Sequence, residues 1–174
     1  MRKRKFFDHR YCRERRKANI LASILLWSVL SYWLISRFVV GGTEVVGRSM
    51  WPTMEDGERL IIDRFSYHFH RPVRGDIIAL SLPGEKSLSV KRVIAGPGEQ
   101  VQIKNGCVWL NGQVLPEPYL PATMQTASDD LSSRIYTVGP SRYFVLGDNR
   151  RISYDSRFFG AIRREAIAGR IILR

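Results

Sequence analysis

Ser49 is the residue of this sequence best placed to act as a nucleophile. It lies in the segment GRSMWPTM, residues 47–54. Gly47 permits a close backbone approach, and Pro52 fixes the chain just after the serine. A hydrolase needs such a nucleophile, a group that removes its proton, and donors for the developing oxyanion. Because serine is also common in turns, the segment alone equally fits a simple turn.

Histidine is the usual base for serine, but the three histidines of this chain are poor candidates. His9 lies in the basic N-terminal segment, while His68 and His70 alternate in YHFHRP, residues 67–72. An extended chain would place these two on one face. Structural zinc usually takes four ligands, and the sequence beyond residue 37 offers only Cys107 besides. We therefore interpret His68 and His70 as solvated loop residues and expect no metal or other cofactor.

Lys91 is the alternative base, because it stands in an apolar strand-like stretch, LSVKRVI, residues 88–94. A lysine with the reference pKa of about 10.4 stays protonated at pH 7. Burial among apolar groups lowers that pKa, by up to about 3–5 units in full burial. Surface lysines on strands are commoner in general, and Lys86 and Lys104 fit that description beside turns. The setting of Lys91 makes it the candidate base.

The N-terminal part of the chain predicts a membrane anchor. Residues 1–17 hold nine Lys or Arg against Asp8 and Glu14, so +7 of the net charge of +12 lies there. The next 19 residues, Ala18–Ser36, carry no formal charge. As a helix they would span the hydrocarbon core of about 30 Å. The basic flank then belongs in the cytoplasm and everything after Arg37 outside, in a single-pass protein of the cytoplasmic membrane.

Other interpretations of this N-terminal region fit less well than a membrane anchor. A cleavable signal peptide fits less well, because the apolar run is long and Ser36-Arg37-Phe38 is a poor cleavage site. A buried core helix rarely runs this far without a polar face. A strongly basic chain also suggests nucleic acid as a partner, but here the charge adjoins an apolar run. We expect membrane lipid as a partner and no nucleic acid.

Beyond residue 37 the pattern changes to short alternating segments. Gly41-Gly42 predicts a linker over 37–42, followed by a catalytic domain over 43–174. Asn105-Gly106 is a strong hairpin signal, and residues 116–141 are interpreted as a surface excursion. The domain is expected to be mainly β, with antiparallel sheets, after one transmembrane helix. Strands are predicted at Glu44–Val46, Arg59–Asp63, Asp76–Leu80, Leu88–Ile94, Gln100–Lys104, Cys107–Leu110, Tyr143–Leu146 and Arg170–Leu173.

Four segments in order resemble those of the type I signal peptidases. They are SMWPT at 49–53, RGDII at 74–78, KRVIAGPGE at 91–99 and GDNRRISYDSR at 147–157. The resemblance covers essentially all of residues 18–174. It implies a membrane-bound serine endopeptidase that removes signal peptides from exported proteins. Ser49 would be the nucleophile and neutral Lys91 the general base.

The resemblance also implies supporting roles. Ser153 matches the residue that holds the lysine ammonium by a hydrogen bond. Asp148, Asp155 and Arg157 match residues that brace the site by ion pairing, and Arg150 and Arg157 would compensate the two carboxylates without a metal. Some members hold the oxyanion with a serine where this chain has Gly47, so backbone N–H groups, chiefly that of Ser49, are expected to form the hole. Nothing explains Arg48, which replaces an often small residue.

The substrates implied are preproteins with small residues at the first and third positions before the cleaved bond. An extended substrate would pair with the edges around 45–47 and 89–91 by strand addition. Two alternatives stay open: a related Ser/Lys maturation peptidase with one dedicated substrate, as in conjugative transfer, and a membrane-tethered binding protein without catalysis. The residues expected to line the two substrate pockets are Val45, Met50, Val90, Leu60 and Ala79.

Overall fold

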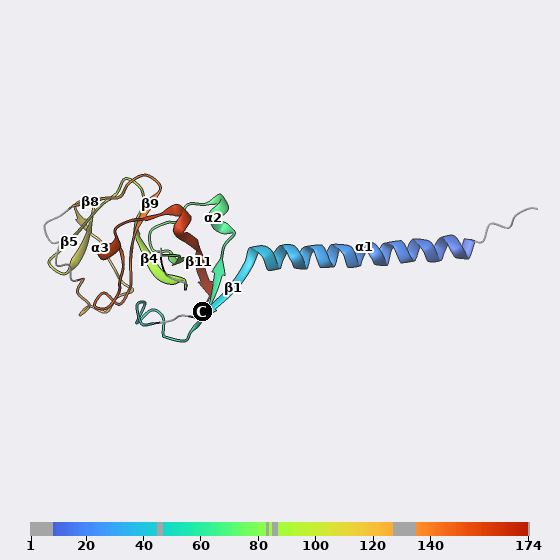
Figure 1. Cartoon of the computed structure of the whole chain (residues 1–174), viewed down its shortest axis with the longest axis horizontal. Coiled ribbons are helices and arrows are strands. Elements are labelled where there is room, and N and C mark those ends of the chain that lie inside the picture. The colour runs from blue at the N-terminus through green and yellow to red at the C-terminus, as the bar shows by residue number, and fades with distance from the viewer. Residues whose placement is uncertain (1–8, 45–46, 83, 85–86, 127–134, 174) are drawn as a thin grey trace, which may run out of the picture. The chain divides into compact units, whose positions relative to one another are not determined.

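The computed structural model describes residues 9–44, 47–82, 84, 87–126 and 135–173, with side chains except at 9–14, 34–44 and 173. The chain divides into two compact units, Met1–Phe38 and Val39–Arg174. The first contains one long helix, and the second holds all the strands (Figure 1).

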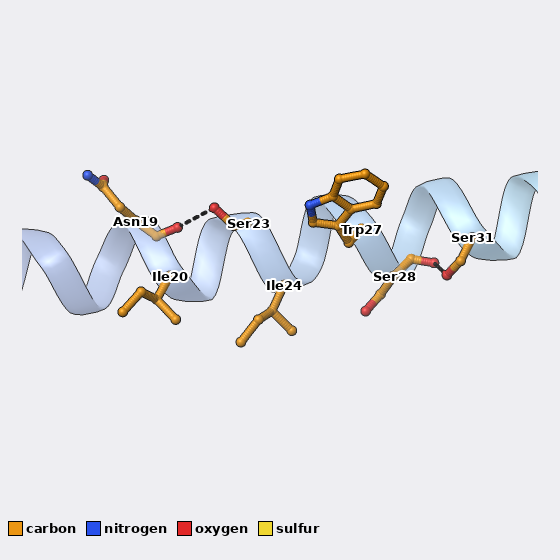
Figure 2. Close-up of a pocket in the computed structure, with 7 residues that line it drawn as sticks. All are labelled: Asn19, Ile20, Ser23, Ile24, Trp27, Ser28 and Ser31. Carbon is orange, nitrogen blue, oxygen red and sulfur yellow. Dashed lines mark hydrogen bonds between the residues drawn. The ribbon is translucent and has the colours of Figure 1, made fainter.

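Helix α1 (His9–Phe38) contains the uncharged run predicted to be helical. Its described large hydrophobic side chains are exposed, from 44% at Leu30 to 75% at Tyr32. Ser23 Oγ donates to the Asn19 carbonyl at 2.8 Å and Ser31 Oγ to the Ser28 carbonyl at 3.0 Å (Figure 2). Within the described part of the chain, no helix meets the length and apolarity needed to cross a membrane. The groove along α1 is lined by Asn19, Ile20, Ser23, Ile24, Trp27, Ser28 and Ser31.

The larger sheet of the second unit has seven strands, in the order β1-β2-β11-β3-β4-β9-β10. All its pairings are antiparallel. The sheet therefore brings β4 between β3 and β9. Its strands are β1 (Val39–Glu44), β2 (Arg59–Asp63), β3 (Ile77–Leu80), β4 (Ser89–Ala95), β9 (Arg142–Leu146), β10 (Ile162–Arg163) and β11 (Ile167–Leu173).

The smaller sheet has the order β7-β6-β5-β8 and is also antiparallel. The β5–β6 hairpin turns at Asn105 and Gly106, whose φ angles are both positive, as the two-residue turn requires. Asn111 and Gly112 repeat this geometry between β6 and β7. The strands are β5 (Gln100–Lys104), β6 (Cys107–Leu110), β7 (Gln113–Val114) and β8 (Tyr136–Thr137).

A shared apolar core joins the two sheets. Ile94 and Phe144 of the larger sheet are fully buried in one cluster with Val101 and Val108 of the smaller sheet. A second cluster joins residues of the larger sheet, such as Ile78, Val93 and Val145, to Tyr67 of the helix over Ser66–Phe69. This packing fixes β4 and β9, the strands that lead into the predicted site. Three short helices complete the unit: α2 (Ser66–Phe69), α3 (Ser156–Phe159) and η1 (Arg164–Ala166).

The prediction of a mainly antiparallel β unit is confirmed, but the linker at 37–42 is wrong. Helix α1 continues to Phe38, and Gly41 and Gly42 lie in β1, opposite Ile62 and Ile61 of β2. Glycine lacks a side chain but keeps both backbone hydrogen-bonding groups, so pairing with β2 holds the segment as a strand. The short strands β7, β8 and β10 were not predicted, because two residues carry no readable alternation.

Candidate active site

Lys91 lies within β4, and the structure brings it to Ser49. The β3–β4 ladder places it opposite Ile78, and only 4% of its surface is exposed. Its Nζ is 3.1 Å from Ser49 Oγ and 3.1 Å from the carbonyl oxygen of Val90. The two residues predicted to react, 42 positions apart in sequence, are therefore within hydrogen-bonding distance.

Ser49 lies outside any strand, in a turn that a few polar contacts hold in place. Its carbonyl oxygen accepts a hydrogen bond from Asn149 N at 3.0 Å, and Trp51 N donates to the Arg48 carbonyl at 3.2 Å. At the start of the turn, Gly47 has a φ of +98°, a conformation that glycine adopts without strain. Gly47 N donates to Asp56 Oδ1 at 2.8 Å.

Ser153 is close to the dyad, but the predicted bond to Lys91 is absent. The Ser153 side chain is 2% exposed, and its Oγ has no hydrogen-bond partner among the described residues. Lys91 Nζ instead contacts Ser49 Oγ and the Val90 carbonyl. Buried polar atoms in folded proteins are nearly always bonded, so this orphan hydroxyl calls for a specific explanation.

Gly147 separates Ser153 from the nucleophile. A Cβ atom at this position would lie 2.2 Å from Ser153 Oγ and 2.5 Å from the carbonyl oxygen of Ser49. Its own N–H donates to Asp155 Oδ2 at 3.0 Å. Only glycine fits in so narrow a space. Gly147 belongs to the segment at 147–157, but its role could not be predicted, because close approach leaves no mark in sequence spacing.

The bracing carboxylates are both buried, and each has its own arginine. Asp148 is 0% exposed and accepts two bonds from Arg92, from Nε at 2.8 Å and Nη2 at 2.5 Å. Thr53, four residues after the nucleophile, also donates to Asp148, at 2.5 Å. Asp155 pairs with Arg157 through contacts at 2.8 and 2.9 Å. These contacts join the segment around Ser49 to β4 and to residues 147–157.

Among the described residues, the Arg150 side chain makes no ion pair with Asp148 or Asp155, although the charge of Asp148 adds to the rise in the pKa of Arg150. Its side chain is fully buried and pairs with Glu117. Burial opposes the charged form, but the contacts with Glu117 outweigh it and raise the pKa of Arg150. Beside this pair, burial and then the Glu117 carboxylate raise the pKa of the Tyr119 phenol. Glu117, Tyr119 and Arg92 are site residues that sequence reasoning missed.

Three of the predicted substrate-pocket residues come together. Met50, Leu60 and Val90 belong to one buried cluster, with at most 6% of each exposed. Ala79 is fully buried and lies opposite Val90 in the β3–β4 ladder. Val45 lies outside the described residues. The four described side chains thus lie in the buried core around Val90, the residue before Lys91.

Neither histidine of the second unit approaches the dyad. His68 and His70 are exposed on and after α2, and each Nδ1 lies 3.3 Å from a carbonyl of the same turn. Among the described residues, no group of three or more His, Cys, Asp or Glu side chains is arranged to hold a metal ion.

Comparisons with known proteins identify the family of the chain. A family profile described as signal peptidase, peptidase S26, matches residues 17–174. Signal peptidase I of Leptolyngbya laminosa is 40% identical over 153 residues, which cover 80% of this chain and 70% of that protein. A signal peptidase I of Bacillus amyloliquefaciens is 36% identical over 168 residues, 90% of each chain. A crystal structure of a signal peptidase I from Enterococcus faecalis aligns with a TM-score of 0.49 and 33% identity, over 59% of this chain and 98% of the other.

Proposed function

The chain belongs to the signal peptidase family, peptidase S26, and we propose that Ser49 and Lys91 are its catalytic dyad. The protein is a serine endopeptidase that removes signal peptides from exported proteins. The observation that carries the dyad is the 3.1 Å separation between Lys91 Nζ and Ser49 Oγ, at a lysine that is 4% exposed. Such burial disfavours the ammonium form and so favours a lysine that can accept a proton.

The reaction then follows from these two atoms. Ser49 Oγ attacks the scissile carbonyl carbon while its proton passes to the Lys91 amine, which gives a tetrahedral oxyanion and an ammonium. The ammonium returns the proton to the leaving amine as the peptide bond breaks. This leaves an ester between Ser49 and the signal peptide. A water molecule, deprotonated by the same amine, hydrolyses the ester and restores the hydroxyl.

Ser153 is assigned to the protonated form of Lys91. An ammonium carries three N–H donors and no acceptor. The buried Ser153 hydroxyl, without a partner among the described residues, is the acceptor that we assign to one of these donors. The oxyanion is assigned to backbone N–H donors, chiefly that of Ser49, because position 47 is glycine and offers no hydroxyl.

Substrate binding is proposed along β4. Strand β9 pairs with β4 only from Arg92 to Ala95. We propose that an extended preprotein segment adds as a strand beside residues 89–91, which precede the β4–β9 pairing. Met50, Leu60 and Val90, with Ala79 opposite, surround this position. Their crowding favours small residues at the first and third positions before the cleaved bond.

Membrane attachment through α1, with the N-terminus in the cytoplasm, is part of the proposal. It rests on the uncharged run Ala18–Ser36, the basic segment before it and the exposed apolar side chains of α1. The hydroxyls of Ser23 and Ser31 bond to carbonyls of the same helix, which suits an environment without water. Protease added outside intact cells should digest the catalytic unit and spare the tail. A protected catalytic unit would reverse this topology.

The cleavage test uses the full chain in detergent micelles with a panel of exported precursors. The proposal predicts cleavage after small residues and no cleavage by Ser49→Ala. Cleavage of one precursor alone would favour the dedicated maturation peptidase. Turnover by Ser49→Ala would remove this serine from the mechanism.

A further inference from the structure

Resting on the dyad proposed above, we propose that residues 116–126 position the active site through Glu117 and Tyr119. This segment follows the smaller sheet and contributes no reacting atom. From its sequence we interpreted it as part of a surface excursion. In the structure its side chains contact the arginine next to Lys91 and the arginine next to Asn149.

Glu117 holds the Arg150 side chain in position through an ion pair. Its carboxylate accepts two hydrogen bonds from the Arg150 guanidinium, one from Nη1 at 3.0 Å and one from Nη2 at 2.5 Å. Thr126 Oγ1 accepts a further bond from Nη1 at 2.5 Å. The exposed fraction is 0% for the Arg150 side chain and 12% for that of Glu117. A bidentate contact of this kind fixes orientation as well as charge.

Tyr119 holds Arg92 in a similar way. The Arg92 guanidinium carbon lies 3.9 Å from the centre of the Tyr119 ring, a cation–π distance. The Tyr119 hydroxyl donates to Glu117 Oε1 at 2.7 Å. The two residues of the segment are therefore linked to each other as well as to the two arginines.

Both arginines lead directly to the dyad. Arg150 Nε donates to the carbonyl oxygen of Gly147 at 3.0 Å, and Gly147 is wedged between Ser153 and the Ser49 carbonyl. Arg92 follows Lys91 in β4 and binds Asp148, which also accepts the hydroxyl of Thr53. Loss of either contact would let the segments that carry Lys91 and Ser49 move relative to each other. Glu117 and Tyr119 are thus positioning residues.

Glu117 also neutralises the charge of the buried Arg150 guanidinium. Replacing it with glutamine keeps the shape of the side chain but leaves the buried Arg150 guanidinium without this carboxylate. The other charged pairs around the dyad, Asp148 with Arg92 and Asp155 with Arg157, are unchanged by the substitution. The added positive field disfavours the ammonium of Lys91, so the acid limb of the pH–rate profile should move to lower pH.

The experiment measures kcat, KM and the pH–rate profile of the full chain in micelles with one preprotein. Glu117→Gln should lower kcat by about 10- to 100-fold, the size expected of a displacement near 1 Å. It should leave KM unchanged and move the acid limb down by about half a pH unit. Tyr119→Leu should lower kcat without moving the limb. Tyr119→Phe, which keeps the ring over Arg92, should recover most of that loss.

Tyr136→Phe is the matched control. Tyr136 lies in β8 and accepts a hydrogen bond from Ala161 N at 3.1 Å, so the variant loses one partly buried hydrogen bond outside the dyad. A merely structural role for Glu117 predicts the same kcat per folded molecule and the same acid limb as this control, and that result would overturn the proposal. Failure of the wild-type chain to cleave the preprotein would instead overturn the proposed function.

Discussion

Lys91 and Ser49 meet at one point, but different kinds of structure hold them. Lys91 is an interior strand residue. Strand β3 pairs with β4 at Lys91 itself, and β9 pairs with β4 from Arg92 onward. Ser49 lies in a turn without strand pairing, and its backbone is tied by single bonds such as Asn149 N to the Ser49 carbonyl. The position of the base therefore depends on a ladder of hydrogen bonds, and that of the nucleophile on a few polar contacts.

This difference indicates where the site is vulnerable. A strand in a packed sheet distributes the effect of one lost contact over many others. A turn held by few contacts does not, and each buried polar group left unpaired there costs about 1–3 kcal/mol. Loss of Ser49 or Lys91 itself aside, substitutions around Ser49 should therefore displace the reacting atoms more than conservative substitutions around Lys91.

The largest effect is expected from removal of either reacting group. Ser49→Ala and Lys91→Ala should each lower kcat by on the order of 10⁴-fold or more, and the double variant should be little worse than either, because the two act as a unit. Lys91→Arg should fail equally, since guanidinium stays protonated. Single-turnover cleavage assays measure this. A Lys91→Arg enzyme with near-normal turnover would show that this lysine is not the base.

Gly147→Ala tests the close packing of Gly147 against Ser153 and the turn that carries Ser49. The added Cβ would meet Ser153 and the Ser49 carbonyl at 2.2–2.5 Å, so backbone must move. We expect kcat to fall by about 100-fold, the cost of a displacement near 1 Å. Gly96→Ala is the control, because a Cβ there has its nearest neighbours at 3.8 and 3.9 Å. Equal activities of the two variants would mean that the turn around Ser49 adapts freely.

The sequence predicted the strand that carries Lys91 better than the contacts that hold the turn around Ser49. The apolar setting of Lys91 predicted a buried strand, and Asn105-Gly106 predicted the hairpin, because both signals are local. The pairing of Arg92 with Asp148 joins residues 56 positions apart and depends on which strands become neighbours. Local spacing carries no such information, so the pairing of Arg150 with Glu117 was not predicted.

Thr53→Val should have a smaller effect on the turn. It keeps the shape of the side chain but removes the hydroxyl that donates to buried Asp148. Hydrogen bonds to charged groups contribute about 1.5–3 kcal/mol, so the free energy of unfolding should fall by that amount. We expect kcat to fall about 10-fold. Denaturant unfolding and cleavage assays measure both, with exposed Thr137→Val as the control that changes neither.

Ser153→Ala should have an effect on activity no larger than that of Thr53→Val, and the opposite effect on stability. The Ser153 hydroxyl is buried and has no partner among the described residues, so the folded enzyme gains no hydrogen bond from it. Replacing an unsatisfied hydroxyl with a methyl group removes a desolvation cost of about 1–3 kcal/mol. The free energy of unfolding should therefore stay the same or rise, as denaturant titration in micelles would show.

Turnover should still fall, by about 10-fold, because the proposed role of this hydroxyl begins only when Lys91 becomes protonated during the reaction. An interaction made in the transition state and not in the resting enzyme lowers kcat when it is lost and leaves KM unchanged. Lower stability together with unchanged kcat would identify Ser153 as a structural residue instead. A stabilised but slower enzyme would show that the resting site holds an acceptor in reserve for the lysine ammonium.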